Sequence, residues 1–191
     1  PRKKETNRFV FGKNAEVFIL EQPESAKKRS AKIYAEITGF GMSDDAFHIT
    51  APAEDGIGAK LAMENALKDS NFNPDQIDHI NAHGTSTPLG DIVESKAIRD
   101  VFKNDADSIL VSSTKSMTGH LLGAAGAIES IYSIFAINNN LVPPTINLEN
   151  PDNEANLDLV SNTSKDKEIK SVMNNTFGFG GTNVSLIFSE F

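Results

Sequence analysis

The sequence contains no cysteine and no tryptophan among its 191 residues. Without a thiol, this chain offers no disulfide bond, no cysteine metal ligand and no thiol nucleophile of its own. Its length fits one domain of ordinary size, or a large part of one, and allows a core to be buried without covalent cross-links. An apolar content of 39% with 23% charged residues is typical of a globular protein.

Clustered positive charge is scarce. The net charge is −8 at pH 7, which argues against nucleic acid as the main partner, because phosphate binding needs gathered Lys and Arg. The charge is uneven: residues 1–32 hold nine basic and four acidic side chains, and residues 33–191 hold nine and 22. We interpret the basic beginning as a flexible, solvated terminus (residues 1–8) followed by a solvated helix face. A docking surface for an acidic partner is the alternative.

Long hydrophobic runs are also lacking. The two longest uncharged stretches, 130–148 and 171–189, are interrupted by Asn, Pro or Gly, so neither could cross a bilayer as a continuous apolar helix. Residues 1–14 lack the apolar centre of a signal peptide. We therefore expect a soluble protein in the cytoplasm, or in a plastid if the source is eukaryotic.

Strand and helix patterns alternate along the chain. Strands are expected at 17–20, 33–40, 77–82, 108–113, 172–175 and 184–188, and helices at 23–32, at 57–70 and from an Asp91 cap to about Phe102. Residues 119–137 carry Glu129 as their one charge and predict a helix buried on every side. The expected fold is α/β, with a mixed sheet, a buried central helix and a closing β-hairpin.

Three loop-like segments could carry chemistry. The first, residues 81–91, follows a strand and brings together an imidazole (His83), hydroxyl groups and two glycines. An ordinary polar turn is the alternative there.

The second segment, 112–120, places Lys115 and His120 at the start of the apolar helix. A helix N-terminus disfavours a cationic imidazole, so His120 is expected to be neutral and able to donate a hydrogen bond to an oxyanion. A capping or packing role is the alternative. Glu129 needs a partner if it is buried, and Lys115 is the obvious candidate.

The third segment, 175–183, is a glycine-rich turn between two strands. Its spacing fits neither dinucleotide nor Walker phosphate loops. Zinc is also disfavoured, because His79 and His83 are expected on a strand and no third ligand is evident. No GxSxG sequence indicates a serine hydrolase.

Taken together, the runs 83–88 (HGTSTP), 115–127 and 178–183 (GFGGTN) resemble the C-terminal half of an elongating (type II) β-ketoacyl-acyl-carrier-protein synthase. The resemblance begins near Phe9 and extends to residue 191. It implies one half of a thiolase-like fold and the decarboxylative condensation of fatty acid elongation, an acyltransferase reaction. It implies no cofactor, since the substrates are carried on the phosphopantetheine of acyl carrier protein.

The resemblance also assigns roles. His83 and His120 match the two active-site histidines that would stabilise the malonyl enolate, Lys115 matches the active-site lysine, and Glu129 its neighbouring carboxylate. Further matches are Thr85, Thr87, His48 and Thr50 along the pantetheine path, and Phe179 as the gate and as an oxyanion-hole N–H. The implied partners are acyl carrier protein, an N-terminal half that carries the nucleophilic cysteine and, for the complete enzyme, a second copy.

Two departures from the family pattern are visible. The nucleophilic cysteine is absent from these residues, so we expect this chain not to condense substrates alone. The family's Gly-Glu-Gly-Ala-Gly stretch is replaced by Gly12-Lys13-Asn14-Ala15-Glu16. A cysteine-free partner subunit (like a chain-length factor, or a malonyl decarboxylase) and a non-catalytic module for dimerisation or carrier binding are the alternatives.

Overall fold

The computed structural model describes residues 10–151 and 156–191. Its strands are β1 (Glu36–Asp44), β2 (His79–Asn81), β3 (Leu110–Ser112), β4 (Leu141–Val142), β5 (Lys165–Asp166), β6 (Ser171–Phe177) and β7 (Thr182–Ser189). Its helices are α1 (Pro23–Lys28), α2 (Ile57–Ser70), α3 (Pro88–Phe102), α4 (Lys115–Thr118) and α5 (Ala125–Asn139), joined by single 3-10 turns such as Leu122–Ala124 and Phe179–Gly181. The predicted flexible terminus, residues 1–8, lies outside the described residues.

The main sheet is mixed, as predicted. Its strand order is β1-β7-β6-β2-β3, with β6, β2 and β3 parallel and β7 antiparallel to both of its neighbours. β6 and β7 form the closing hairpin, whose pairing runs from Ser171 opposite Ser189 to Phe177 opposite Asn183. The sequence therefore predicted the mixed sheet and its closing hairpin correctly.

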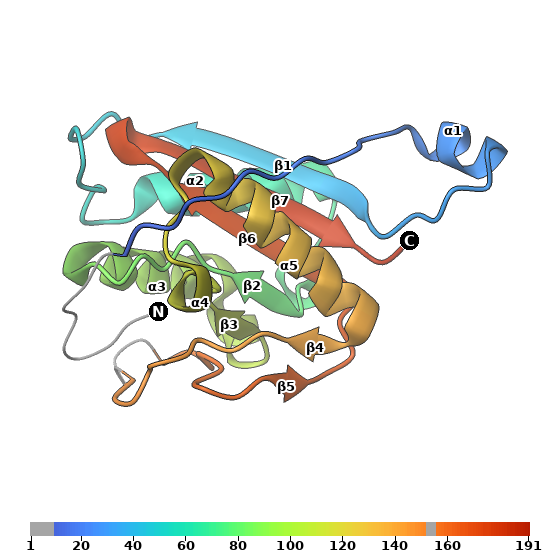
Figure 1. The fold of residues 1–191 in the computed structure, drawn as a ribbon. Coiled ribbons are helices and arrows are strands. Elements are labelled where there is room, and N and C mark those ends of the chain that lie inside the picture. Colours follow the sequence, from blue (N-terminus) through green and yellow to red (C-terminus); the bar gives the residue numbers. More distant parts are fainter. Residues whose placement is uncertain (1–9, 152–155) are drawn as a thin grey trace.

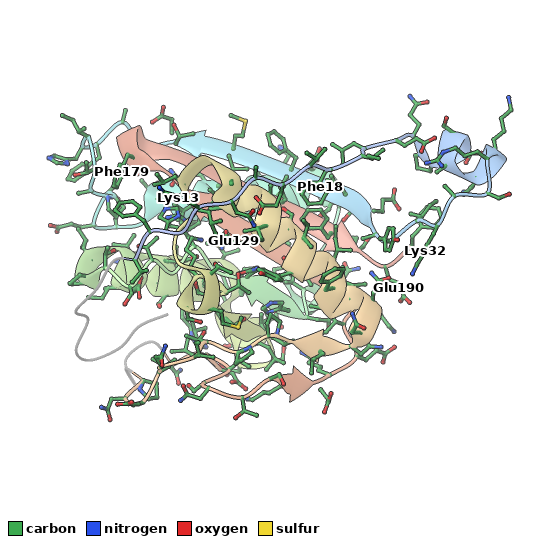
Figure 2. The ribbon with its side chains drawn as sticks, in the orientation of Figure 1. Lys13, Phe18, Lys32, Glu129, Phe179 and Glu190 are labelled. Atoms are coloured by element: carbon green, nitrogen blue, oxygen red, sulfur yellow. The ribbon has the colours of Figure 1, made fainter. Side chains whose placement is uncertain are left out.

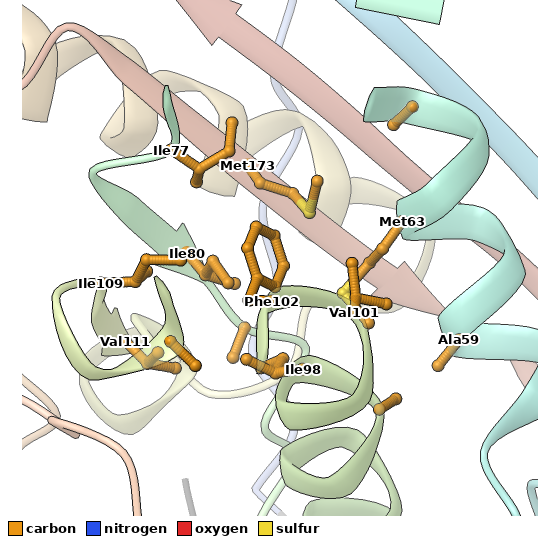
Figure 3. Packing of buried hydrophobic residues seen from close by; sticks show 14 of the residues in the cluster. Ala59, Met63, Ile77, Ile80, Ile98, Val101, Phe102, Ile109, Val111 and Met173 are labelled. Atoms are coloured by element: carbon orange, nitrogen blue, oxygen red, sulfur yellow. The ribbon is translucent and has the colours of Figure 1, made fainter. Parts of the chain in front are cut away.

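Helices cover both faces of the sheet. α5 runs diagonally across one face, and α2 and α3 lie behind the sheet (Figure 1). The larger core cluster fills the space between the sheet and α2 and α3, where Phe102 and Met63 are fully buried beside Ile80 of β2 and Met173 of β6 (Figure 3). A smaller cluster lies under α5 and includes Ile137, Val142 and Val172.

The strand β1 begins and ends later than expected. The predicted strand ends at residue 40, but β1 continues through Gly39 and Gly41 to Asp44. A Cβ at either glycine would collide with backbone carbonyls of α2, those of Ala66 and Ala62 respectively. The glycines therefore allow α2 to approach the strand closely, and they do not terminate it.

Side chains of α2 bond to two backbone groups on the outer edge of β1. The N–H of Phe40 donates to Asp69 Oδ2 (3.0 Å), and Asn65 Nδ2 donates to the carbonyl of Met42 (2.9 Å). Two groups of an otherwise open strand edge are thus satisfied within the domain.

The predicted strand at 17–20 is wrong for the described residues. The segment is extended but pairs with no described strand, and Val17 and Ile19 are 88% and 86% exposed. A strand needs a neighbour to complete its hydrogen bonds, and a short run of apolar residues alone supplies none.

Two helix boundaries differ from the prediction. α1 ends at Lys28, short of the expected residue 32. α3 begins at Pro88, so Asp91 lies within its first turn and does not cap it. The Asp91 carboxylate instead accepts the N–H of Ser86 (3.1 Å), which bends the preceding loop back onto the helix.

The predicted continuous helix at 119–137 is interrupted. Gly119 (φ 73°) ends α4 and Leu122 (φ 54°) follows in the left-handed region, so α5 starts only at Ala125. α5 is also not buried on every side in this chain, because its Phe135 is 53% exposed. None of the helices in the described part of the chain has the length and apolar character to cross a membrane.

Candidate active site

Parallel pairing brings the three predicted segments together. In the register of the sheet, Asn81 at the end of β2 lies opposite Ser112 of β3 and Asn174 of β6. The carboxyl ends of parallel strands meet at one edge of a sheet, the usual location of sites in α/β folds. The loops after β2, β3 and β6 therefore open onto the same space, although they are far apart in the sequence.

This edge of the sheet holds a cavity of about 860 Å³. Its wall takes residues from all three segments and from the loop that follows β1. Among its lining residues are Phe11, Asp45, Thr50, His83, Thr85, Thr87, His120, Phe177 and Phe179. The cavity is large enough for a drug-sized or cofactor-sized molecule.

Two histidines meet at this cavity. The ring centroids of His83 and His120 are 5.3 Å apart, and the planes are nearly perpendicular at 87°. Phe177 also contacts His83, at 5.9 Å between ring centroids. Burial, reinforced by the nearby charge of Lys115, lowers the pKa of His83 well below its usual value. Both rings reach the same wall, and His83 is neutral at physiological pH.

His120 is also neutral, but for a different reason from the one predicted. It precedes α5 by several residues and does not sit at its N-terminus. Its pKa is lowered by partial burial and by Lys115. The N–H of Leu122 donates to Nδ1 of the ring (3.3 Å), so the ring proton belongs on Nε2. A neutral imidazole with a proton on Nε2 is a hydrogen-bond donor.

The predicted pair of Lys115 and Glu129 is confirmed. The ammonium group forms an ion pair with Glu129 Oε1, and the two residues are only 6% and 0% exposed. Burial raises the pKa of Glu129 to about 7, although Lys115 acts in the opposite direction. Figure 2 shows Glu129 on α5, behind the segment that carries Lys13. The pair thus places a compensated positive charge next to both imidazoles.

The predicted pantetheine-binding residues separate into two groups. Thr85, Thr87 and Thr50 line the cavity, and the hydroxyl oxygens of Thr85 and Thr87 are 3.3 Å apart. His48 is not among the cavity-lining residues. Its Nδ1 accepts the N–H groups of Thr50 and Ala51 (both 3.2 Å), so the imidazole shapes the turn that carries Thr50.

The glycine-rich turn presents an aromatic side chain. Phe179 is 72% exposed and lines the cavity (Figure 2). Gly180 and Gly181 follow with φ values of 84° and 91°, which favour glycine strongly. The Gly180 N–H donates to the carbonyl of Ile49 (2.9 Å) and so joins this turn to the His48 loop.

Comparison with known proteins agrees with this geometry. Residues 34–149 match the model of the β-ketoacyl synthase C-terminal domain. This chain belongs to the β-ketoacyl synthase family. It is 53% identical over 182 residues to the 3-oxoacyl-acyl-carrier-protein synthase 2 of Coxiella burnetii, which covers 95% of this chain and 44% of the relative. The mitochondrial 3-oxoacyl-acyl-carrier-protein synthase of Arabidopsis thaliana is 54% identical over 185 residues, covering 95% and 40%.

Solved structures show the same fold. The ishigamide ketosynthase/chain length factor superposes with a TM-score of 0.94 at 38% identity, covering 99% of this chain and 46% of that chain. A type II PKS acyl-carrier protein in complex with its ketosynthase gives a TM-score of 0.86, also at 38% identity, over 90% and 42%. The predicted thiolase-like α/β fold is therefore confirmed, and this β-ketoacyl synthase domain spans less than half the length of these relatives.

Sequence reasoning missed one carboxylate of the site. Glu94 of α3 is buried and accepts the N–H groups of His83 and Gly84, both at 2.8 Å. Burial raises its pKa. Glu94 is three residues before Ala97 and four before Ile98, on the buried stripe of the helix. That position was the available signal for a carboxylate that faces inward.

Buried amides that fasten α5 to the sheet were missed as well. Asn81 Nδ2 donates to the carbonyl of Glu129 (3.1 Å), and Asn174 Nδ2 donates to the carbonyl of Gly126 (3.2 Å). Ser113 Oγ donates to the carbonyl of Gly84 (2.9 Å) and joins the first two loops. These bonds fix the loops and α5 relative to one another.

His79 has a structural position. It is fully buried on β2, and Nδ1 bonds to the carbonyl of Leu110 (2.8 Å). The described ranges contain no group of three His, Cys, Asp or Glu side chains that could hold a metal ion. Of the strand predicted at 77–82, His79–Asn81 form β2, and His83 lies in the loop that follows it.

Proposed function

We propose that this domain supplies the malonyl-activating part of a 3-oxoacyl-acyl-carrier-protein synthase. The observation that carries the proposal is the meeting of two neutral imidazoles, His83 and His120, at one cavity in front of a buried Lys115–Glu129 pair. Fixed donors of this kind are suited to a reaction in which negative charge develops on one oxygen. The 3-oxoacyl-acyl-carrier-protein synthases among its relatives support that reaction class.

The proposed reaction begins with a malonyl thioester in the cavity. The bond between the α-carbon and the carboxylate breaks, carbon dioxide leaves, and the electron pair moves onto the thioester oxygen as an enolate. The Nε2–H of His120 and the ring of His83 stabilise that oxygen. The enolate carbon then attacks the carbonyl of an acyl thioester, and the departing thiolate regains the electron pair of the broken C–S bond.

Other residues have proposed roles in binding and in the second step. Thr85, Thr87 and Thr50 hydrogen-bond the phosphopantetheine arm, and His48 contributes by holding the turn of Thr50. Phe179 acts as a gate on its glycine-rich turn, and its backbone N–H stabilises the oxygen of the acyl thioester. Lys115 provides positive charge beside the enolate, and Glu129 compensates that charge in the free enzyme.

The acyl thioester requires a nucleophile from outside these residues. A thiol of an N-terminal half is the proposed acyl carrier within the enzyme, because this chain has no cysteine. The proposed partners are therefore that half, acyl carrier protein and a second copy of the complete enzyme. The structure of a related ketosynthase with an acyl-carrier protein supports the carrier as a partner. We propose that the complete enzyme acts in the cytoplasm.

The test joins this domain to the N-terminal part of the Coxiella burnetii relative. The fusion should convert acyl and malonyl carrier substrates to 3-oxoacyl product at pH 7.5, and this domain alone should give no steady product. His83→Ala and His120→Ala should each reduce product formation at least about 100-fold, the scale for loss of one oxyanion donor. His79→Asn is the matched control, because His79 lies on the same strand-loop unit but bonds only to the sheet. Full product formation by both alanine variants would refute the proposal.

The same set of variants separates the alternatives. A malonyl decarboxylase would release carbon dioxide from malonyl carrier protein without the N-terminal part, and His83→Ala would abolish the release. A purely structural subunit would bind carrier protein equally well in all variants and release nothing.

A further inference from the structure

The segment Val10–Gly12 is held against His120 by backbone bonds on both sides. The His120 N–H donates to the carbonyl of Val10 (2.6 Å), and the Gly12 N–H donates to the carbonyl of His120 (2.9 Å). Phe11 and His120 form a parallel β-bridge. Figure 2 shows the chain at Lys13 passing over the connection between α4 and α5. Two segments more than a hundred residues apart thus fix the main chain of one candidate donor.

The main chain around His120 is poorly suited to stay in place without that support. Gly119 before it has φ 73°, and Leu122 two residues after it has φ 54°. A leucine in the left-handed region is strained, and its side chain is 56% exposed, so packing compensates little of the strain. The same turn supplies the Leu122 N–H that bonds to Nδ1 of His120. If the turn relaxed, the bond that sets the ring's tautomer would be lost.

Only one residue of the altered glycine-rich stretch is sterically required to be glycine. A Cβ on Gly12 would lie 2.5 Å from the carbonyl oxygen of Thr118 and 3.1 Å from Cγ of Leu121. Lys13 and Asn14, which replace the next two residues of the family pattern, are exposed. The departure from the pattern therefore starts where the contact with His120 ends.

We propose that Gly12 is a positioning residue, whose close backbone contact holds the His120–Leu122 turn and thereby keeps the ring proton of His120 on Nε2. The inference deepens the proposed function, since it concerns how the donor nitrogen is prepared. Gly12 acts through His120 and is not itself assigned any contact with substrate.

The experiment measures the tautomer ratio of His120 by 15N nuclear magnetic resonance of the 191-residue chain near pH 7.5. The Nε2–H form should dominate in the unmodified chain. Gly12→Ala should lower the ratio of Nε2–H to Nδ1–H about fivefold, the factor that one ordinary hydrogen bond supplies. Gly123→Ala is the matched control, because it lies three residues after His120 and no atom lies within 4 Å of its added Cβ. It should leave the ratio unchanged.

A rescue variant separates positioning from general damage. Adding Leu122→Gly to Gly12→Ala should restore most of the ratio, because glycine adopts the left-handed turn without strain. If Gly12→Ala does not fold, a chain beginning at Asn14 removes the contact without overpacking and should show the same fivefold loss. An unchanged ratio in a folded Gly12→Ala or truncated chain would overturn the proposal, and so would a dominant Nδ1–H form in the unmodified chain.

The result can be read independently of the proposed reaction, because the tautomer is measured without substrate. An inactive fusion enzyme with the expected ratios would refute the proposed function and leave the positioning role of Gly12 in place. An active fusion with no change of ratio would do the reverse.

Discussion

Acidification should destabilise this domain through His79. The side chain is fully buried on β2, and its Nδ1 bonds to the carbonyl of Leu110, which requires a proton on Nδ1. Burial, with a smaller contribution from the charge of Lys167, lowers the pKa of His79 from 6.5 to about 4. The unfolded chain therefore takes up a proton at a higher pH than the folded one does.

The sign and size follow from that difference. A base whose pKa is lowered by folding contributes stability that is present above pH 6.5 and is lost as the pH falls toward 4. The contribution lost relative to neutral pH is about 1.4 kcal/mol at pH 5.5 and about 2.5 kcal/mol at pH 4.5. For a domain of ordinary stability, the second figure is a large fraction of the whole free energy of unfolding.

The assay compares the unmodified chain with His79→Asn in urea denaturation from pH 7.5 to pH 4.5. An asparagine amide can donate to Leu110 from a position close to that of Nδ1, but it does not titrate. The difference between the two unfolding free energies should shift by about 2.5 kcal/mol across this range in favour of the variant. His83, whose pKa is lowered too, remains in both proteins and cancels in the comparison. Parallel curves between pH 6.5 and 4.5 would refute a neutral, buried His79.

Two further predictions concern the site. Glu129→Gln leaves the buried Lys115 ammonium without its counter-charge and should lower the free energy of unfolding in urea by about 3–5 kcal/mol. The double variant Lys115→Met, Glu129→Leu should recover most of this loss. A loss below about 1 kcal/mol for Glu129→Gln would contradict the buried pair. Gly181→Ala should lower the free energy of unfolding by at least about 1–2 kcal/mol in thermal or urea denaturation, because φ is 91° and the added Cβ collides with the Asp45 carboxylate. Gly123→Ala, which has open space around its added Cβ, should lower it by less than about 1 kcal/mol. Equal losses in the two variants would contradict the strained turn.

Most residues of the site could be predicted from the sequence because they lie in three short loop segments. Each loop was recognised as a candidate by its polar residues next to a strand, and the family resemblance implied that His83 and His120 act at one site. The Lys115–Glu129 pair was predictable from a single charge in an apolar helix, which needs a partner when buried. This second inference depends on the general cost of burying a charge, and the structure shows both the contact of the two rings and the ion pair.

The parts that sequence could not predict depend on the neighbours of a residue. The predicted strand ended at residue 40, but β1 continues past it, with α2 packed over Gly39 and Gly41. The position of Glu94 on the buried stripe of α3 indicates a carboxylate that faces inward, but its partners are set by the backbone of the first loop, which turns back onto it. The break at Leu122 has no local sequence signal, since leucine favours a continuous helix. In each case a long-range contact overrides the local preference.

The two side-chain hydrogen bonds at the β1 edge bear on self-association. An open strand edge is a template on which a second polypeptide can continue the sheet, and it is a common starting point for aggregation. Here Asp69 and Asn65 already occupy the N–H of Phe40 and the carbonyl of Met42. A foreign strand would have to displace both side chains and leave a carboxylate without its donor. Sheet extension is therefore disfavoured at this edge even though apolar side chains of β1 are exposed beside it.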